Sequence, residues 1–232
     1  MSKYTHIKEE AYNANMLLPV HGLVIFTFGN VSTADRSLGV FAIKPSGVPY
    51  EQLSPENMVI VDFEGKVVEG TLRPSSDTLT HAVLYKHWEH IGGIAHTHSL
   101  YATSWAQAQR DIPIFGTTHA DHLTADIPCA PPMDDSMING NYEHETGFQI
   151  MNCFKSKKLS YREVEMILVG NHAPFTWGKD AAKAVYNSAV LEAIAKMAYV
   201  TESINPNTAR MKESLIKKHF ERKHGAGAYY GQ

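Results

Sequence analysis

Short apolar segments rich in strand-forming residues alternate along this chain with segments of helical periodicity. Residues 166–169 (MILV) form the clearest strand pattern, and residues 180–204 form the longest helical one. Such interleaving predicts an α/β fold, because each apolar face of a sheet has to be covered by helices. The other predicted strands are residues 23–28, 40–43, 58–62, 66–69, 93–99, 114–117 and 127–129, and the other predicted helices are residues 7–18, 77–84, 102–108, 146–154 and 209–224.

The length and composition fit a single domain that spans residues 1–232. The chain has 232 residues, 44% of them hydrophobic, which is enough for a sizeable buried core. Repeats, low-complexity stretches and linkers are absent from the sequence. The N-terminus is polar and unlike a signal peptide, and no apolar run approaches the ~20 residues of a membrane span. We therefore expect a cytoplasmic protein.

Charge and cysteine content exclude several classes of function. The net charge of −3 argues against non-specific binding of nucleic acid or membranes, which requires a dense basic face. An anionic substrate must therefore be held by a local positive site. Cys129 and Cys153 lack C-x-x-C spacing, which argues against a disulfide scaffold and against a thiolate zinc site.

Two histidines, His96 and His98, stand two residues apart in the predicted strand 93–99. Side chains at positions i and i+2 leave a strand on the same face, so both imidazoles can reach one ion. Neutral histidine is a good ligand for zinc and similar metals. The alternative is a pair of histidines on a solvated strand face, but the apolar and small neighbours indicate an inner strand, where paired polar rings need a reason.

A third histidine, His172, follows the predicted strand 166–169, at the kind of strand end where α/β proteins build sites. A loop histidine bonded to the backbone is the alternative. Asp77 and Asp121 are both candidates for a fourth ligand, and spacing leaves the choice open; an acidic residue such as Asp77 in a first helical turn also suits the helix dipole. Three histidines and a carboxylate fit Zn2+, with Mn2+ or Co2+ as substitutes.

Three small polar loops supply the groups that a phosphate needs, namely several N–H or O–H donors and one cation. Ser75 or Ser76 is the predicted N-cap of the helix at 77–84, where free amides face an anion. Lys44 supplies positive charge, and Gly47 permits close approach of the backbone. Each loop alone is better explained as an ordinary turn or cap, whereas their combination with a metal site predicts phosphate binding.

Several segments together identify a resemblance to the class II aldolase/epimerase family over essentially the whole chain, in the form of its sugar-phosphate epimerases. The matching segments are GNVS (29–32), IKPSGV (43–48), PSSDT (74–78), GGIAHTHS (92–99), GTTHAD (116–121), INGNYEHETG (138–147), HAPFTWGK (172–179) and KHGAGAYYGQ (223–232). The resemblance implies a three-layer fold with a mostly antiparallel central sheet flanked by helices.

The resemblance also implies the roles of individual residues. A metal is expected on Asp77, His96, His98 and His172, and acid/base roles are expected for Asp121 and Tyr230. A homotetramer with sites between subunits is implied as well, so that Asp121 and Tyr230 act on a neighbour's metal. Phosphate contacts are implied for Asn30, Lys44, Ser46, Gly47, Ser75 and Ser76, and supporting roles for Thr117, Glu143 and His219.

The activity that the resemblance implies is the interconversion of two phosphorylated ketopentoses, L-ribulose 5-phosphate and D-xylulose 5-phosphate, by cleavage and re-formation of the C3–C4 bond. L-Arabinose, L-ascorbate and L-lyxose breakdown all pass through this ester, and all three remain open as pathways. One alternative is an aldolase of the L-fuculose-phosphate type, although those relatives carry glutamate where Asp77 stands. The other is a non-catalytic module like the adducin head, which has lost the metal histidines.

Overall fold

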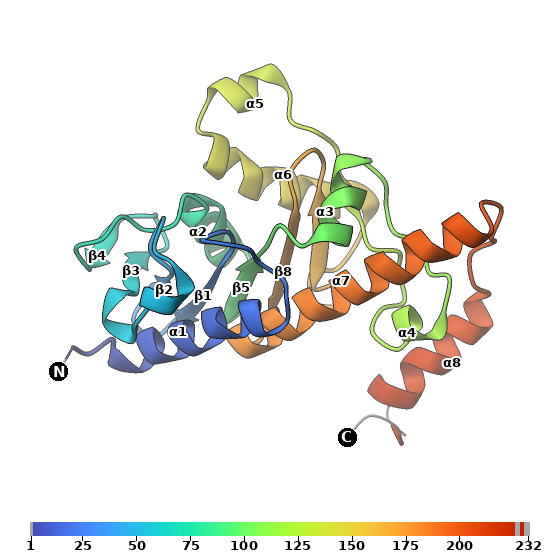
Figure 1. The fold of residues 1–232 in the computed structure, drawn as a ribbon, viewed down its shortest axis with the longest axis horizontal. Helices are drawn as coiled ribbons and strands as arrows, with labels where there is room; N and C mark the ends of the chain where they lie inside the picture. The colour runs from blue at the N-terminus through green and yellow to red at the C-terminus, as the bar shows by residue number, and fades with distance from the viewer. Residues whose placement is uncertain (1, 226–227, 230–232) are drawn as a thin grey trace.

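The computed structural model describes residues 2–225 and 228–229, and a mostly antiparallel sheet forms its centre (Figure 1). The strand order is β4-β3-β2-β1-β5-β8-β7-β6, and among the described pairs only β6 and β7 run parallel. This confirms the predicted α/β fold. The strands are β1 (Asn30–Asp35), β2 (Val40–Ile43), β3 (Val59–Asp62), β4 (Val67–Glu69), β5 (Gly93–His96), β6 (Cys129–Ala130), β7 (Met166–Val169) and β8 (Pro174–Gly178).

Helices cover both faces of the sheet, with α1 and the long α7 running side by side across one of them (Figure 1). Among the described residues no helix has both the length and the hydropathy to cross a membrane. The helices are α1 (Thr5–Val20), α2 (Thr78–His87), α3 (Leu100–Gln107), α4 (Thr117–Ala120), α5 (Asp135–Asn139), α6 (Tyr142–Lys157), α7 (Ala181–Ile204) and α8 (Glu213–His224), with short 3-10 turns at Tyr50–Gln52 and Pro55–Asn57.

The strand pleat divides the apolar side chains between two cores. In β2, Phe41 points to the core under α2 and α6, while Ala42 points to the core under α1. In β3, Val61 points to the core under α2 and α6, and Ile60 points to the core under α1. Because alternate residues face opposite sides, a strand buried on both sides reads as a continuous apolar run. The sheet is therefore the middle layer of three.

Close packing between β5 and the start of α7 fixes the end of the sheet on which His96 lies. A Cβ on Gly93 would come within 2.4 Å of the Cα of Ala181. Only glycine permits this approach. The backbone of β5 is thus held directly against α7 three residues before His96.

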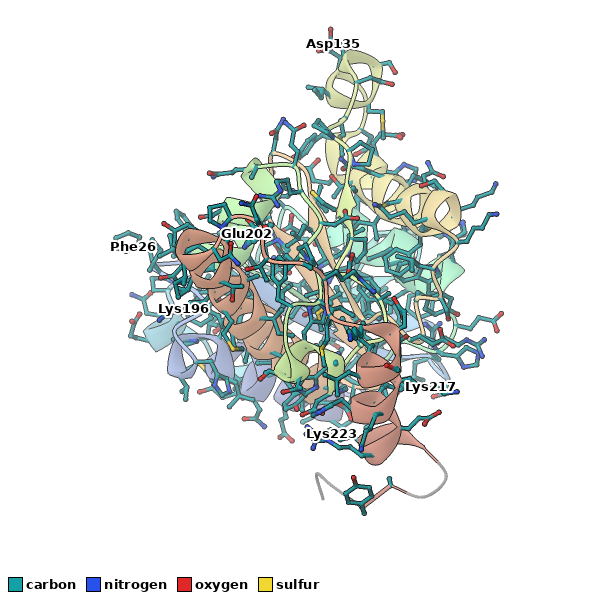
Figure 2. The ribbon with its side chains drawn as sticks, turned by 90° about the vertical axis from the view of Figure 1, so that its right-hand side faces the viewer. Phe26, Asp135, Lys196, Glu202, Lys217 and Lys223 are labelled. Atoms are coloured by element: carbon teal, nitrogen blue, oxygen red, sulfur yellow. The ribbon has the colours of Figure 1, made fainter. Side chains whose placement is uncertain are left out.

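The prediction of a strand at 23–28 is wrong. Phe26 has φ +53°, in the left-handed region that interrupts a strand, and its side chain is 81% exposed. Figure 2 shows Phe26 projecting from the edge of the molecule. Leu23 is buried, whereas Ile25 and Phe28 are also exposed. Apolar residues therefore produced a strand-like pattern in a segment that forms no strand of the described sheet.

Several other boundaries differ from the predictions. Residues 30–35, where no strand was predicted, form β1, and β8, which starts at Pro174, was also missed. The strand predicted at 93–99 ends at His96, so His98 lies beyond it. Residues 114–117 form no strand, and the last helix starts at Glu213. The N-cap of α2 is Asp77 itself, and Ser75 and Ser76 precede it.

Candidate metal centre and its surroundings

Three histidines meet at one end of β5. His96 is the last residue of β5, His98 follows two residues later, and His172 lies between β7 and β8. Because β8 pairs with β5, with Phe175 opposite His96, the turn before β8 arrives beside the histidine pair. One nitrogen from each of the three rings lies within 4.8 Å of the others. The structure therefore brings together the three predicted histidines.

Hydrogen bonding fixes how the His96 ring presents its nitrogens. His96 Nδ1 lies 2.9 Å from the carbonyl oxygen of Pro174, which can only accept, so Nδ1 carries the proton. Nε2 of His96 is then a lone pair, and it lies 3.1 Å from Nε2 of His98. Phe175 stacks on His96 at a centroid distance of 4.1 Å and holds the ring plane. A ring held in one tautomer by a backbone carbonyl is the usual arrangement of a metal-bound histidine.

A buried ring nitrogen of His172 also fits the role of a metal ligand. Its Nδ1 is buried and has no hydrogen-bond partner among the described residues. Burial of such a nitrogen without a partner is costly, and a cation is one way to satisfy it. Burial also lowers the pKa of His96 and of His172 to about 3, and it lowers the pKa of His98. All three rings are therefore neutral near pH 7, the form that binds metals. The donor set fits a divalent ion.

Asp77 lies beside the three histidines rather than among them. Its Oδ2 is 3.9 Å from His96 Nε2 and accepts a hydrogen bond of 2.7 Å from Asn30 Nδ2. Asn30 starts β1 directly opposite His96, and this register explains how a residue far away in sequence orients the carboxylate. Asp77 thus remains a prediction as the fourth ligand, oriented by a contact that sequence spacing did not reveal.

A polar cavity of about 340 Å³ adjoins the histidines. The predicted phosphate-binding residues Asn30, Lys44, Ser46, Gly47, Ser75 and Ser76 all line it, together with Thr27, Phe28, Gly29, Pro45, Asp77, His96 and His98. The structure thus places three separate loops around one space beside the histidine group.

Lys44 is the cationic group of this cavity and is only 2% exposed. Its Nζ donates to the carbonyl oxygens of Thr27 at 3.2 Å and Pro45 at 3.4 Å. No carboxylate among residues 2–225 and 228–229 lies within ion-pair distance of it. Burial lowers the pKa of Lys44 to about 8. A buried cation without an acidic partner favours an anionic ligand.

The remaining predicted residues that the structure describes, Asp121, His219, Thr117 and Glu143, lie elsewhere and do not line this cavity. Asp121 and His219 meet where α4 packs against α8, with His219 Nδ1 2.9 Å from Asp121 Oδ1 (Figure 1). Thr117 is exposed at the start of α4. Glu143 lies in the first turn of α6, where its carbonyl oxygen accepts from Thr80. Tyr230 lies outside the described residues.

Two residues that contact predicted site residues, Arg222 and Tyr142, were not identified from the sequence. Arg222 donates to both carboxylate oxygens of Asp121, and its spacing of three residues from His219 on a helix indicates a shared face. Tyr142 lies with its ring 6.2 Å from the ring of His172. No sequence pattern links Tyr142 to His172, since the contact depends on how α6 meets the turn before β8.

The chain is similar in sequence to a known family over most of its length. The family model described as "Class II Aldolase and Adducin N-terminal domain" matches residues 9–199. A curated protein of Salmonella paratyphi C (strain RKS4594), "L-ribulose-5-phosphate 4-epimerase UlaF", is 49% identical over 226 residues, covering 97% of this chain and 98% of its own.

Solved structures agree on the fold. A structure described as L-fuculose 1-phosphate aldolase matches with a TM-score of 0.76 at 22% identity, covering 96% of this chain and 97% of its own. The aldolase/epimerase/decarboxylase-like protein YgbL from Klebsiella pneumoniae matches with a TM-score of 0.71 at 20% identity, covering 94% of this chain and 99% of its own. At these identities the likeness concerns the arrangement of helices and strands.

Proposed function

We propose that this chain, which belongs to the class II aldolase and adducin N-terminal domain family, is an L-ribulose-5-phosphate 4-epimerase that interconverts L-ribulose 5-phosphate and D-xylulose 5-phosphate. The observation that carries the proposal is the three-histidine group beside a cavity lined by a buried lysine, which has no carboxylate partner among the described residues. The relative of 49% identity supports the choice of substrate. We infer that residues 1–232 form one domain and that the enzyme is cytoplasmic.

The position of the reacting carbon decides the type of chemistry. The hydrogen on C4 of a 2-ketose is β to the carbonyl, so its removal gives a carbanion without enolate stabilisation. Cleavage of the C3–C4 bond avoids this, because loss of the C4 hydroxyl proton yields glycolaldehyde phosphate and an enediolate. Rotation of the aldehyde and attack on its other face then invert C4. The reaction therefore needs charge stabilisation, a phosphate anchor and two groups that exchange a proton with the C4 oxygen.

His96, His98 and His172 are the ligands proposed for a divalent cation, with Asp77 as the fourth. Zn2+ suits this donor set, with Mn2+ or Co2+ as substitutes. When bound, the ion supplies Lewis-acid stabilisation of the negative charge that develops on the sugar oxygens. The chain itself fixes the geometry, because Pro174 holds the His96 tautomer and Asn30 orients Asp77.

The cavity lined by Asn30, Lys44, Ser46, Gly47, Ser75 and Ser76 is the proposed phosphate site. Ser75 and Ser76 precede the ten-residue helix α2, whose N-terminus favours an anion. Lys44 provides the counter-charge from a buried position. By holding the phosphate, these groups keep the aldehyde fragment in place while it turns.

Asp121 and Tyr230 are the proposed proton-transfer groups, with Thr117, Glu143 and His219 supporting the site. Within one chain, Asp121 does not line the cavity beside the histidines. That separation supports a site shared between subunits, in which Asp121 and Tyr230 of one subunit serve the histidine group of its neighbour; the family resemblance implies that the assembly is a homotetramer.

Product analysis tests this proposal. We expect the protein to convert L-ribulose 5-phosphate into D-xylulose 5-phosphate, detected by a coupled assay specific for the product. Net accumulation of free glycolaldehyde phosphate would instead indicate an aldolase. Failure to turn over the ester or to bind a divalent metal stoichiometrically would indicate a non-catalytic module of the adducin type.

A further inference from the structure

We propose that Arg222 is a positioning residue for proton transfer, because its guanidinium holds the Asp121 carboxylate in one orientation and docks α8 onto α4. This inference rests on the proposed function, in which Asp121 exchanges the proton of the C4 hydroxyl. Neither the family resemblance nor the relatives' names assign a role to Arg222.

Arg222 and Asp121 form a bidentate contact, with two hydrogen bonds between the guanidinium and the carboxylate. Arg222 Nε donates to Asp121 Oδ1 at 3.1 Å, and Nη2 donates to Oδ2 at 2.9 Å. Such bidentate pairs fix the plane of the carboxylate as well as its position, which a lysine cannot do. Both side chains are shielded, with 23% and 12% of their surfaces exposed, so solvent screens the pair less than a surface ion pair.

Two further contacts from α8 converge on the same residue. His219 Nδ1 lies 2.9 Å from Asp121 Oδ1, and His224 Nε2 lies 3.0 Å from the Asp121 carbonyl oxygen. Asp121 therefore receives contacts from three residues of α8, spaced over the last two turns of that helix. The carboxylate plane is set almost entirely by α8.

The polar contacts matter more here because α8 has little apolar attachment. Ile216 is its only fully buried residue among those described, in a small cluster with Ile114 and Ala120. In Figure 2 the exposed face of α8 carries Lys217, and Lys223 marks its C-terminal end. A helix with so little apolar attachment relies on its polar contacts for its position, among them the contact between Arg222 and Asp121.

The charges around Asp121 come from three elements. His219, Arg222, Lys223 and His224 approach from α8, His122 adjoins Asp121, and Lys183 of α7 faces His122. Burial raises the pKa of Asp121, but the hydrogen bonds from Arg222 and His219 outweigh it and lower the pKa overall. Loss of Arg222 therefore moves the pKa of Asp121 upward, and the carboxylate becomes protonated at higher pH.

The test compares Arg222→Ala and Arg222→Lys with the control Arg210→Ala. Arg210 also ties α8 to the body, through Asp126 and Glu213, but it does not contact Asp121. We expect Arg222→Ala to lower kcat by about 100-fold, the usual effect of an impaired acid/base group, with little change in KM. The acidic limb of its kcat/KM profile should rise by about one pH unit. Added guanidinium should restore part of the rate of Arg222→Ala. Arg222→Lys keeps the positive charge but loses the bidentate contact, so we expect its kcat to stay low. Arg210→Ala leaves the contacts of Asp121 in place, so we expect its kcat to be retained.

Carboxyl-carbon NMR of Asp121 in wild type and Arg222→Lys provides a readout that is independent of turnover, and should show a higher pKa in the variant. If the wild type is inactive on L-ribulose 5-phosphate, the proposed function fails, while a shifted Asp121 titration still supports the contact. If the wild type is active and Arg222→Ala keeps its kcat and acidic limb, the inference is overturned. An equal loss in Arg210→Ala, or an Asp121 titration indifferent to Arg222, overturns it as well.

Discussion

His96 and His98 face each other with their Nε2 atoms 3.1 Å apart, although β5 ends between them. Because His96 Nδ1 donates to Pro174, its Nε2 offers only a lone pair toward His98. His172 completes the group from the turn before β8. Two chain segments distant in sequence thus direct three imidazoles at one point.

Replacing either His96 or His98 with asparagine should remove both the bound metal and the activity. Each substitution takes one nitrogen from the group, and we expect turnover to fall by at least about 100-fold, which corresponds to ~2.7 kcal/mol of barrier. His90→Asn is the matched control, because His90 is exposed and lies outside the group. Elemental analysis together with turnover checks this, and a metal-replete, fully active His96→Asn protein would be incompatible with the proposed ligands.

Asp77→Asn should weaken metal binding while the fold is retained. The variant keeps the shape of the side chain but removes the charge that Asn30 now orients at 2.7 Å. We expect the metal Kd to rise roughly 10- to 100-fold, in line with losses at metal sites when supporting contacts are removed. Competition with a chromogenic chelator measures it. An unchanged Kd would show that a residue other than Asp77 supplies the fourth ligand.

Lys44→Met should raise KM far more than it lowers kcat. A hydrogen bond to a charged group contributes about 1.5–3 kcal/mol, which corresponds to a roughly 10- to 150-fold change in KM. Lys86→Met is the control, since Lys86 forms only a surface pair with Glu64. Steady-state kinetics on both variants decides the matter, and equal KM values would remove Lys44 from the phosphate site.

The same lysine predicts the basic side of the pH profile. Burial lowers the pKa of Lys44 to about 8, so the free enzyme loses this positive charge as the pH rises through that value. We therefore expect kcat/KM to fall above about pH 8 in the wild type. The Lys44→Met variant lacks the titrating group, and its profile should stay flat over that range. An identical basic limb in both proteins would assign the limb to another group.

Gly93→Ala should destabilise the protein by about 1–3 kcal/mol, as overpacking does. The new Cβ would come within 2.4 Å of Ala181 and push β5 away from α7. Gly116→Ala is the comparison, because no atom lies within 4 Å of its added Cβ, and we expect a cost below about 1 kcal/mol as an N-cap change. Chemical denaturation compares the two, and similar losses would contradict the packing argument.

The sequence was sufficient where local pattern and burial coincide. Strand 166–169 was predicted at its observed bounds, and the helix expected from residue 180 begins at Ala181 with Asp180 as its N-cap. It failed at residues 23–28, where an apolar run is exposed and Phe26 adopts a left-handed backbone. Periodicity reports which residues are apolar, and it does not report whether a partner strand is available.

The candidate site was likewise predicted only in part from the sequence. The H-x-H pair and the later His172 indicated a metal site, and the structure gathers them. Their convergence does not come from strand alternation, since His98 lies beyond β5. The link from Asn30 to Asp77 depends on the pairing of β1 with β5, and the fork from Arg222 to Asp121 depends on how α8 docks. Such contacts are set by tertiary packing, and sequence spacing carries little information about them.

Metal dependence of the epimerase reaction tests the central claim most directly. The protein is stripped with a strong chelator, assayed for conversion of L-ribulose 5-phosphate into D-xylulose 5-phosphate, and then titrated with Zn2+, Mn2+ or Co2+. We predict that the stripped enzyme is inactive and that activity returns in proportion to bound metal, reaching its maximum at one ion per histidine group. Full turnover by a metal-free protein would contradict the account.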